Sequence, residues 1–127
     1  MIFLENISLR KFNTFGIDAN ARKLCKISSK DDIHKLRKNN EFTNNKYLIL
    51  GGGSNIMLTK NFDGLIVKNE IIGKIKTHED EKNTIIKVGA GENWHEFVLW
   101  TIKEGLSGIE NLALIPGNIG AAPMQNI

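Results

Sequence analysis

Residues 51–55, with the sequence Gly-Gly-Gly-Ser-Asn, are the part of this chain whose residue types best suit a binding chemistry. Glycines let a backbone come close to a ligand, and the N–H groups of a tight turn can donate hydrogen bonds to phosphate oxygens. Ser54 and Asn55 add short side-chain donors at the same place. The alternative is a plain turn, which a glycine cluster after a strand forms more often than a ligand site.

The glycine cluster matches neither of the two common phosphate-binding motifs. The dinucleotide-binding pattern Gly-x-Gly-x-x-Gly requires a glycine where this chain has Ile56. The P-loop requires a lysine after its last glycine, but Gly53 is followed by Ser54. If residues 51–55 bind a phosphate, they do so in another fold.

A second segment of small residues lies near the end of the sequence. Pro116 and Gly117 indicate a turn, and residues 120–122, Gly-Ala-Ala, would form a surface without large side chains. Such a surface lets a flat molecule or another backbone come into van der Waals contact. The alternative is a loop that simply packs on the sheet.

No arrangement of side chains suggests catalysis or metal binding by this chain alone. His34, His78 and His95 have no histidine or cysteine at ligand spacing, so no metal site is expected. Cys25 has apolar neighbours and no evident base partner, which indicates a buried, inert thiol. The acidic run 79–81 is typical of a solvated hairpin tip, and His95 is expected on the solvent side of a helix. The pattern therefore favours a protein that binds a group with its own reactivity.

Several short segments have the apolar patterns of strands. The expected strands span residues 24–28, 47–50, 64–67, 71–77 and 84–88. The segment 47–50 directly precedes the glycines and is expected to be buried. Short strands that meet mostly in sequence order favour an α+β domain over a doubly wound parallel sheet.

A first helix is expected after the strand 24–28. Ser28 or Ser29 can cap it, and the acids at 31–32 suit the positive end of a helix. Ile33 and Leu36 would form its buried face. The asparagines at 39–40 would end it.

The second helix has the clearest signals in the sequence. Asn93 is a good N-cap, and Glu96 can return the hydrogen bond. Gly105 is expected to end the helix. Apolar residues recur at helical spacing and would form one buried face, made of Trp94, Phe97, Val98, Thr101 and Ile102.

Composition places the chain among ordinary globular domains. With 127 residues, 41% hydrophobic and 24% charged, it can form one domain with a real core. The net charge of +3 comes from dispersed lysines, so neither nucleic-acid binding nor membrane association is expected. Apolar runs are too short for a transmembrane helix, and the first residues do not resemble a signal peptide. The single Cys25 excludes an intrachain disulfide and suits a reducing compartment.

Blocks of residues along the chain resemble, in order, the UDP-N-acetylenolpyruvoylglucosamine reductases, flavoenzymes of bacterial cell-wall precursor synthesis. The blocks are residues 13–17, 48–55, 88–95, 108–117 and 120–127. They cover nearly the whole chain from Phe12 onward. Their number and order make the resemblance specific.

This resemblance implies that residues 1–127 form a two-lobed FAD-binding domain of the vanillyl-alcohol-oxidase (PCMH) type, with an α+β lobe on each side. The FAD would be bound without a covalent link. Backbone N–H groups would hold its diphosphate, and these belong to Gly51, Gly52, Gly53, Ser54 and Asn55. Other residues would line the flavin, namely Pro116, Gly117, Gly120, Ala121, Gln125 and Asn126.

The resemblance also implies a reaction and a cellular role. NADPH would reduce the flavin, and flavin N5 would deliver hydride to the enolpyruvyl double bond of a UDP-sugar substrate. The product would be UDP-N-acetylmuramate, a precursor of peptidoglycan and so needed for cell shape and division. We expect a monomeric, cytoplasmic oxidoreductase with FAD and the UDP-sugar as its partners.

The sequence departs from the family in one respect, because the family's chains continue well past the residue that corresponds to Ile127. Their catalytic arginine, serine and glutamate lie in that later part. We therefore expect a truncated chain with an incomplete second lobe, no substrate domain, no catalytic residues of its own and no activity alone. The alternatives are a non-catalytic flavin- or nucleotide-binding module and the remnant of a decayed gene.

Overall fold

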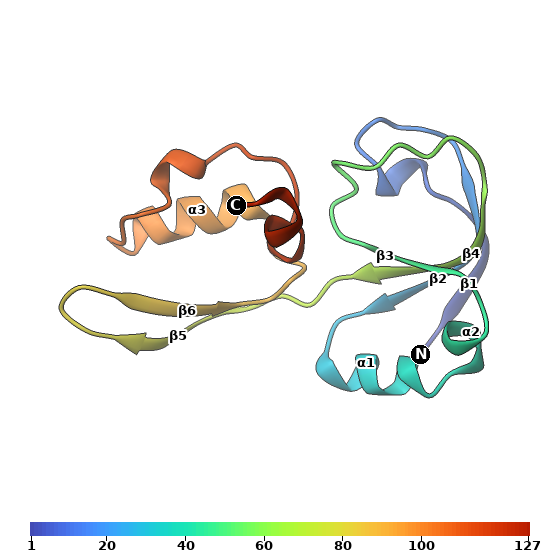
Figure 1. Cartoon of the computed structure of the whole chain (residues 1–127), viewed down its shortest axis with the longest axis horizontal. Coiled ribbons are helices and arrows are strands. Elements are labelled where there is room, and N and C mark those ends of the chain that lie inside the picture. The colour runs from blue at the N-terminus through green and yellow to red at the C-terminus, as the bar shows by residue number, and fades with distance from the viewer. The chain divides into compact units, whose positions relative to one another are not determined.

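Two compact units, Met1–Glu70 and Ile71–Ile127, make up the chain, and the computed structural model describes residues 1–127 (Figure 1). A mixed sheet in the order β1-β2-β4-β3 forms the centre of the first unit. Its strands are β1 (Phe3–Ser8), β2 (Asn20–Ile27), β3 (Tyr47–Leu50) and β4 (Phe62–Asn69). β1 is antiparallel to β2, whereas β4 is parallel to both β2 and β3.

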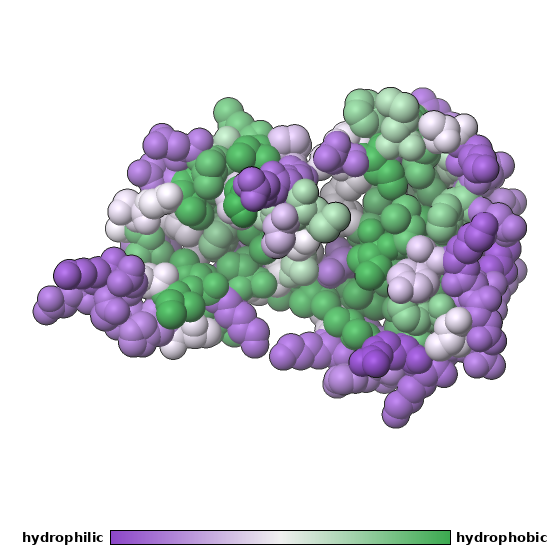
Figure 2. All heavy atoms as spheres, in the orientation of Figure 1, coloured by the Kyte–Doolittle hydropathy of each residue, from purple (hydrophilic) through white to green (hydrophobic).

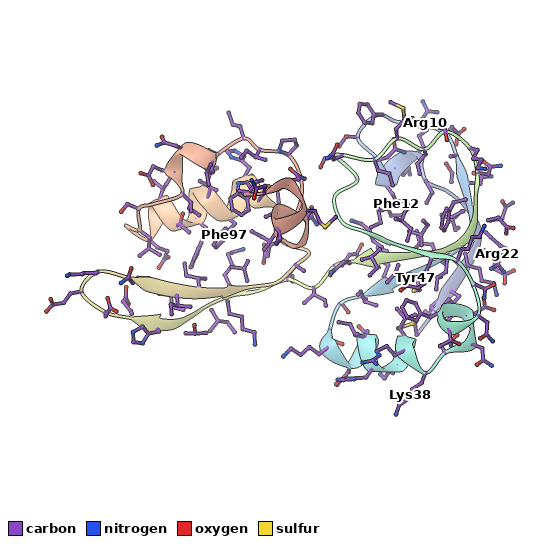
Figure 3. The ribbon with its side chains drawn as sticks, in the orientation of Figure 1. Arg10, Phe12, Arg22, Lys38, Tyr47 and Phe97 are labelled. Atoms are coloured by element: carbon purple, nitrogen blue, oxygen red, sulfur yellow. The ribbon has the colours of Figure 1, made fainter.

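Both faces of this sheet are covered. Helices α1 (Lys30–Arg37) and α2 (Asn40–Thr43) lie on one side, and the connections 9–19 and 51–61 lie on the other (Figure 1). Leu24, Leu50 and Ile66 form a buried cluster with Leu9 and Ala21 beneath those connections. Phe12, labelled in Figure 3, packs against this cluster. Alternation along a strand turns Leu65 and Val67, both fully buried, to the opposite face of β4.

The second unit consists of a hairpin, a helix and two 3-10 segments. β5 (Lys74–Glu79) pairs antiparallel with β6 (Thr84–Val88), and α3 (Trp94–Lys103) follows. The 3-10 segments are η2 (Glu110–Leu112) and η3 (Ile119–Gln125). Trp94, Val98 and Ala122 form the buried cluster of this unit. The indole Nε1 of Trp94 donates to the Leu112 carbonyl at 2.8 Å, which ties η2 to α3.

Helices α1 and α3 begin where the sequence predicts, whereas the short α2 was not expected. Ser29 Oγ accepts from the Asp32 N–H at 3.1 Å, and Asn93 Oδ1 accepts from the Glu96 N–H at 3.0 Å. Hydrogen bonds from the backbone and hydroxyl of Ser28, and from Ser29, hold the pKa of Asp32 below its ordinary value. The N-caps of both helices are therefore confirmed, although Glu96 does not return the hydrogen bond to Asn93.

The burial of α3 agrees with the predicted face except at its edge. Trp94, Phe97, Val98 and Thr101 are buried, but Ile102 is 48% exposed. Phe97 points from α3 toward the hairpin (Figure 3), and Ile102 lies at the border of that face. The prediction for Ile102 was wrong because the hairpin and the 3-10 segments do not cover the border position.

The predicted bounds hold for β3 and β6, whereas other expectations about the strands were wrong. β1 was not expected, and β5 begins at Lys74 rather than at Ile71. β4 lies between β2 and β3, so the strands do not simply follow one another across the sheet. The segment 47–50 is an edge strand, which leaves Tyr47 51% and Ile49 59% exposed instead of buried.

Two further expectations about side chains hold. The residues 79–81 are exposed at the hairpin tip, which is hydrophilic at the far left of Figure 2. Cys25 is buried, and burial raises the pKa of its thiol to about 11. No helix of the chain has the length and hydropathy that would be required to cross a bilayer.

Candidate functional site

The glycine cluster begins where β3 ends, at the edge of the sheet where the parallel strands present their carboxyl ends. Leu50, the last residue of β3, lies opposite Lys68 on β4. Residues 51–61 then return to the start of β4, because a parallel neighbour requires a crossover connection. This crossover contains no helix, so its backbone N–H groups are not used by helical hydrogen bonds.

Gly53 fixes the shape of this connection. Its φ is +69°, a left-handed conformation that side chains disfavour, and a Cβ at this position would lie 2.0 Å from the Phe12 carbonyl oxygen. The Gly53 carbonyl accepts from the Thr14 N–H at 3.1 Å. A glycine at position 53 is therefore required by the fold itself, whatever the loop binds.

The turn at residues 13–17 supports Gly53 from the other side. Asn13 is 7% exposed, and its Nδ2 donates to the carbonyls of Leu9 at 2.8 Å and Ile17 at 3.0 Å. Its Oδ1 accepts from the Ile17 N–H at 3.0 Å. These three hydrogen bonds hold the turn together, and the turn supports the glycine cluster.

The backbone of residues 52–55 has donors that the chain does not use. The N–H groups of Gly52, Gly53, Ser54 and Asn55 donate no hydrogen bond to any other group of the chain. The great majority of backbone N–H groups in folded proteins have a partner, so successive free donors can serve an anionic ligand. Backbone N–H donors of this kind are the groups that bind anions in tight loops.

Lys68 is a residue of this site that sequence reasoning missed. Its Nζ donates to the Gly51 carbonyl oxygen, and its side chain is half-buried. A lysine directly after the apolar run 65–67 was the available signal. The pattern of β4 alone could not show which group that lysine would contact.

The second predicted segment lies in the other unit and is bound to the residues before α3. The Gly120 N–H donates to the Ala90 carbonyl at 2.9 Å, and the Ile119 N–H donates to the Glu92 carbonyl at 2.9 Å. Gly117 accepts from the Trp94 N–H at 2.9 Å. Segment 117–120 is thus packed along residues 90–94, and this packing already accounts for part of its small-residue composition.

The side chains of this segment differ in exposure. A Cβ on Gly120 would lie 2.8 Å from the Ala90 Cβ, so a glycine is needed there for close packing. Ala121 is half-buried, whereas Ala122 is 6% exposed and belongs to the core, so the expected small-residue surface does not include it. The other predicted flavin-lining residues range from buried to exposed, namely Pro116 (exposed), Gly117 (buried), Gln125 (half-buried) and Asn126 (exposed).

His95 differs from its prediction. It is half-buried, and its Nδ1 accepts from the Leu114 N–H at 3.2 Å. Leu114 has a φ of +65° and is 77% exposed. His95 thus stabilises the connection before Pro116, a contact that its position on the helix did not reveal.

Comparison with known proteins gives the family. Residues 21–127 match the family described as FAD binding domain. The chain belongs to this family. Its α+β class and the expected resemblance to UDP-N-acetylenolpyruvoylglucosamine reductases are confirmed.

The individual relatives share one name. The chain is 48% identical over 124 residues to the UDP-N-acetylenolpyruvoylglucosamine reductase of Burkholderia pseudomallei strain K96243. The aligned residues cover 98% of this chain and 36% of the relative. It is 45% identical over 125 residues to the reductase of the same name from Paraburkholderia phymatum, with 98% of this chain and 36% of the relative covered. The chain thus spans little more than a third of the length of these relatives.

A solved structure is similar in fold. The UDP-N-acetylenolpyruvylglucosamine reductase from Thermus caldophilus superimposes with a TM-score of 0.69 and 24% sequence identity. The match covers 95% of this chain and 41% of that chain. At this identity the likeness establishes the fold, while the roles of individual residues stay predictions.

Proposed function

We propose that this chain binds FAD non-covalently and provides the cofactor-binding part of a reductase that acts on UDP-N-acetylenolpyruvoylglucosamine. The observation that carries the proposal is the run of unused backbone N–H groups at residues 52–55, at a connection shaped by Gly53. Membership of the FAD-binding family and the shared name of the relatives support it. When bound, FAD would supply the hydride chemistry that the chain's own side chains lack.

The proposed contacts are assigned unit by unit. In the unit Met1–Glu70, the diphosphate would accept hydrogen bonds from the backbone of residues 51–55, with Ser54 and Asn55 adding side-chain donors. In the unit Ile71–Ile127, the flavin would be lined by the segment 116–126, through the residues Pro116, Gly117, Gly120, Ala121, Gln125 and Asn126.

The proposed reaction follows from the substrate named for the relatives. Hydride would add to one carbon of the enolpyruvyl double bond and a proton to the other, which gives UDP-N-acetylmuramate. We propose that NADPH is the hydride donor and that the reaction serves peptidoglycan synthesis. We also propose that the protein is a monomer and that it is located in the cytoplasm, where a single reduced thiol is stable. Because the chain spans 36% of its relatives' length, we propose that it holds the cofactor but does not reduce the UDP-sugar by itself.

A titration with FAD tests the binding proposal. We expect the chain to quench FAD fluorescence with a micromolar dissociation constant. This corresponds to a binding free energy of about −8 kcal/mol. Gly52→Val should weaken binding at least about thirtyfold, because a branched side chain would keep the diphosphate from the backbone donors. Gly52 is not among the residues with positive φ, so circular dichroism of this variant should match that of the unmodified chain.

Thr59→Val is a matched control, because Thr59 is an exposed residue of the same crossover connection. It should bind FAD like the unmodified chain. Equal FAD affinity in Gly52→Val would show that the glycines form only a turn. NADPH oxidation by this chain in the presence of FAD and the UDP-sugar would overturn the proposal that it does not catalyse the reaction alone.

A further inference from the structure

Lys68 is a half-buried cation whose contacts do not include a carboxylate. Its Nζ donates to the Gly51 carbonyl oxygen, and it takes part in no ion pair. The charged groups that influence the pKa of Lys68 are Glu70 and Lys26, which are paired with each other at 2.9 Å. Burial lowers the pKa of Lys68, as expected for a cation held away from water without a counter-ion.

The contact with Gly51 determines the direction of a neighbouring donor. The chain has no cis peptide bond, so the Gly51 carbonyl and the Gly52 N–H point in opposite directions within their shared peptide plane. Because the Gly51 carbonyl points at the Lys68 ammonium group, the Gly52 N–H points away from that ammonium group. That N–H donates to no other group of the chain.

We infer that Lys68 is a positioning residue for the diphosphate, an inference that rests on the proposed binding of FAD. The ammonium group fixes the orientation of the Gly51–Gly52 peptide and withdraws electron density from its carbonyl. Polarisation of a peptide in this way strengthens the hydrogen bond that its N–H donates. Lys68 thus acts on the anion through the peptide, without touching the ligand.

A purely structural role for Lys68 makes a different prediction. A simple tether would stabilise the fold of the first unit, and its loss would lower the unfolding midpoint. FAD affinity would then follow stability and not the charge at position 68. The positioning role requires that a charged donor restores FAD affinity where a neutral side chain does not.

The experiment compares FAD dissociation constants in four forms of the full chain, which are the unmodified chain, Lys68→Met, Lys68→Arg and Lys60→Met. We expect Lys68→Met to bind FAD about tenfold more weakly and Lys68→Arg to stay within about threefold, because hydrogen bonds from charged donors are the stronger ones. Lys60 is exposed and makes no hydrogen bond or ion pair, so Lys60→Met removes the same charge nearby and should bind like the unmodified chain. Adenosine diphosphate, used as a competitor, should lose affinity for Lys68→Met to a similar degree.

The outcomes separate the two proposals. Normal FAD affinity in Lys68→Met would overturn the inference and leave the proposed function intact. No FAD binding by the unmodified chain would overturn both. If Lys68→Met does not fold, Lys68→Gln replaces it, since glutamine offers a neutral donor. Affinity equal to that of Lys68→Arg in that variant would exclude a role for the charge.

Discussion

At the scale of single residues, neighbouring glycines of the cluster have different physical roles. Gly53 is required by the fold, because its backbone is left-handed and the Phe12 carbonyl occupies the space that a side chain would need. Gly52 is not among the glycines with positive φ, and its own N–H is one of the free donors of the loop. Substitutions at these two positions should therefore affect different properties, stability in one case and ligand binding in the other.

Gly53→Ala should destabilise the chain by more than about 3 kcal/mol, through left-handed strain and the clash with Phe12. Gly16→Ala is the matched control, because Gly16 has a similar φ of +64° but no atom within 4 Å of the added Cβ. It should lose only about 1–2 kcal/mol from backbone strain. Urea denaturation followed by circular dichroism measures both, and equal losses would contradict the role of the Phe12 carbonyl.

The roles of some of these residues could be predicted from the sequence, and the roles of others could not. The glycine cluster could be found because consecutive glycines are costly and need a reason. Lys68 and His95 could not be assigned, because their partners Gly51 and Leu114 lie 17 and 19 residues away in sequence. Residue types show which groups are available, whereas contacts across the fold decide what each group does.

At the scale of elements, Glu92 joins the hairpin to the segments around α3. Its carboxylate accepts from the Lys74 Nζ at 2.8 Å and from the Gly73 N–H at 2.8 Å, and its side chain is 15% exposed. Its carbonyl accepts from the Ile119 N–H. The hydrogen bond from Lys74, the Gly73 N–H and the positive charge of Lys74 hold the pKa of Glu92 below its ordinary value.

This lowered pKa predicts how the stability of the second unit depends on pH. The contribution of Glu92 is fully present above the pKa of an unfolded glutamate, about 4.3, and is lost as the pH falls through the lower folded pKa. At pH 7, Glu92→Gln should destabilise the chain by about 1–3 kcal/mol, because Lys74 loses a charged partner in a part-buried position. Near pH 3 the difference from the unmodified chain should shrink.

Denaturant midpoints measured between pH 7 and pH 3 test this expectation. Glu96→Gln is a suitable control, because Glu96 is exposed on α3 and its side chain makes no ion pair. The denaturant midpoints of Glu92→Gln and of the unmodified chain could differ by the same amount at every pH. That result would show that packing, and not the ionised carboxylate, stabilises this junction.

The helices and strands were predicted correctly where the local sequence signals are strong. The predictions failed where the neighbouring strands determine whether a residue is buried. The bounds of β3 and β6 and the start of α3 follow from short apolar runs and a cap. β1 has only two half-buried positions, Phe3 and Ile7, because it lies at the sheet edge, so its sequence has no clear period. The exposure of Ile49 has the same origin, since hydrophobicity cannot tell an edge strand from a central one.

At the scale of the whole molecule, the two units contain very different amounts of sheet. In the unit Met1–Glu70, β2 and β4 each pair with a strand on both sides, and both faces of the sheet are covered. In the unit Ile71–Ile127, β5 and β6 pair only with each other, and Ile75 and Ile85 are 61% and 57% exposed. Two-stranded hairpins have little stability of their own, so this hairpin depends on α3 and on Glu92.

We therefore expect amide hydrogens of β2 and β4 to exchange at least about a hundredfold more slowly than those of β5 and β6, because local opening requires less free energy in the hairpin. Hydrogen exchange followed by mass spectrometry, on peptides that cover each strand pair, measures the difference. The α3 amides near the buried Val98 provide the internal reference for the second unit. Saturating FAD should slow exchange in the segment 51–55, where the free donors lie. Equal protection of the two strand pairs without FAD would show that the hairpin is stabilised as firmly as the central sheet, against the reasoning from strand pairing.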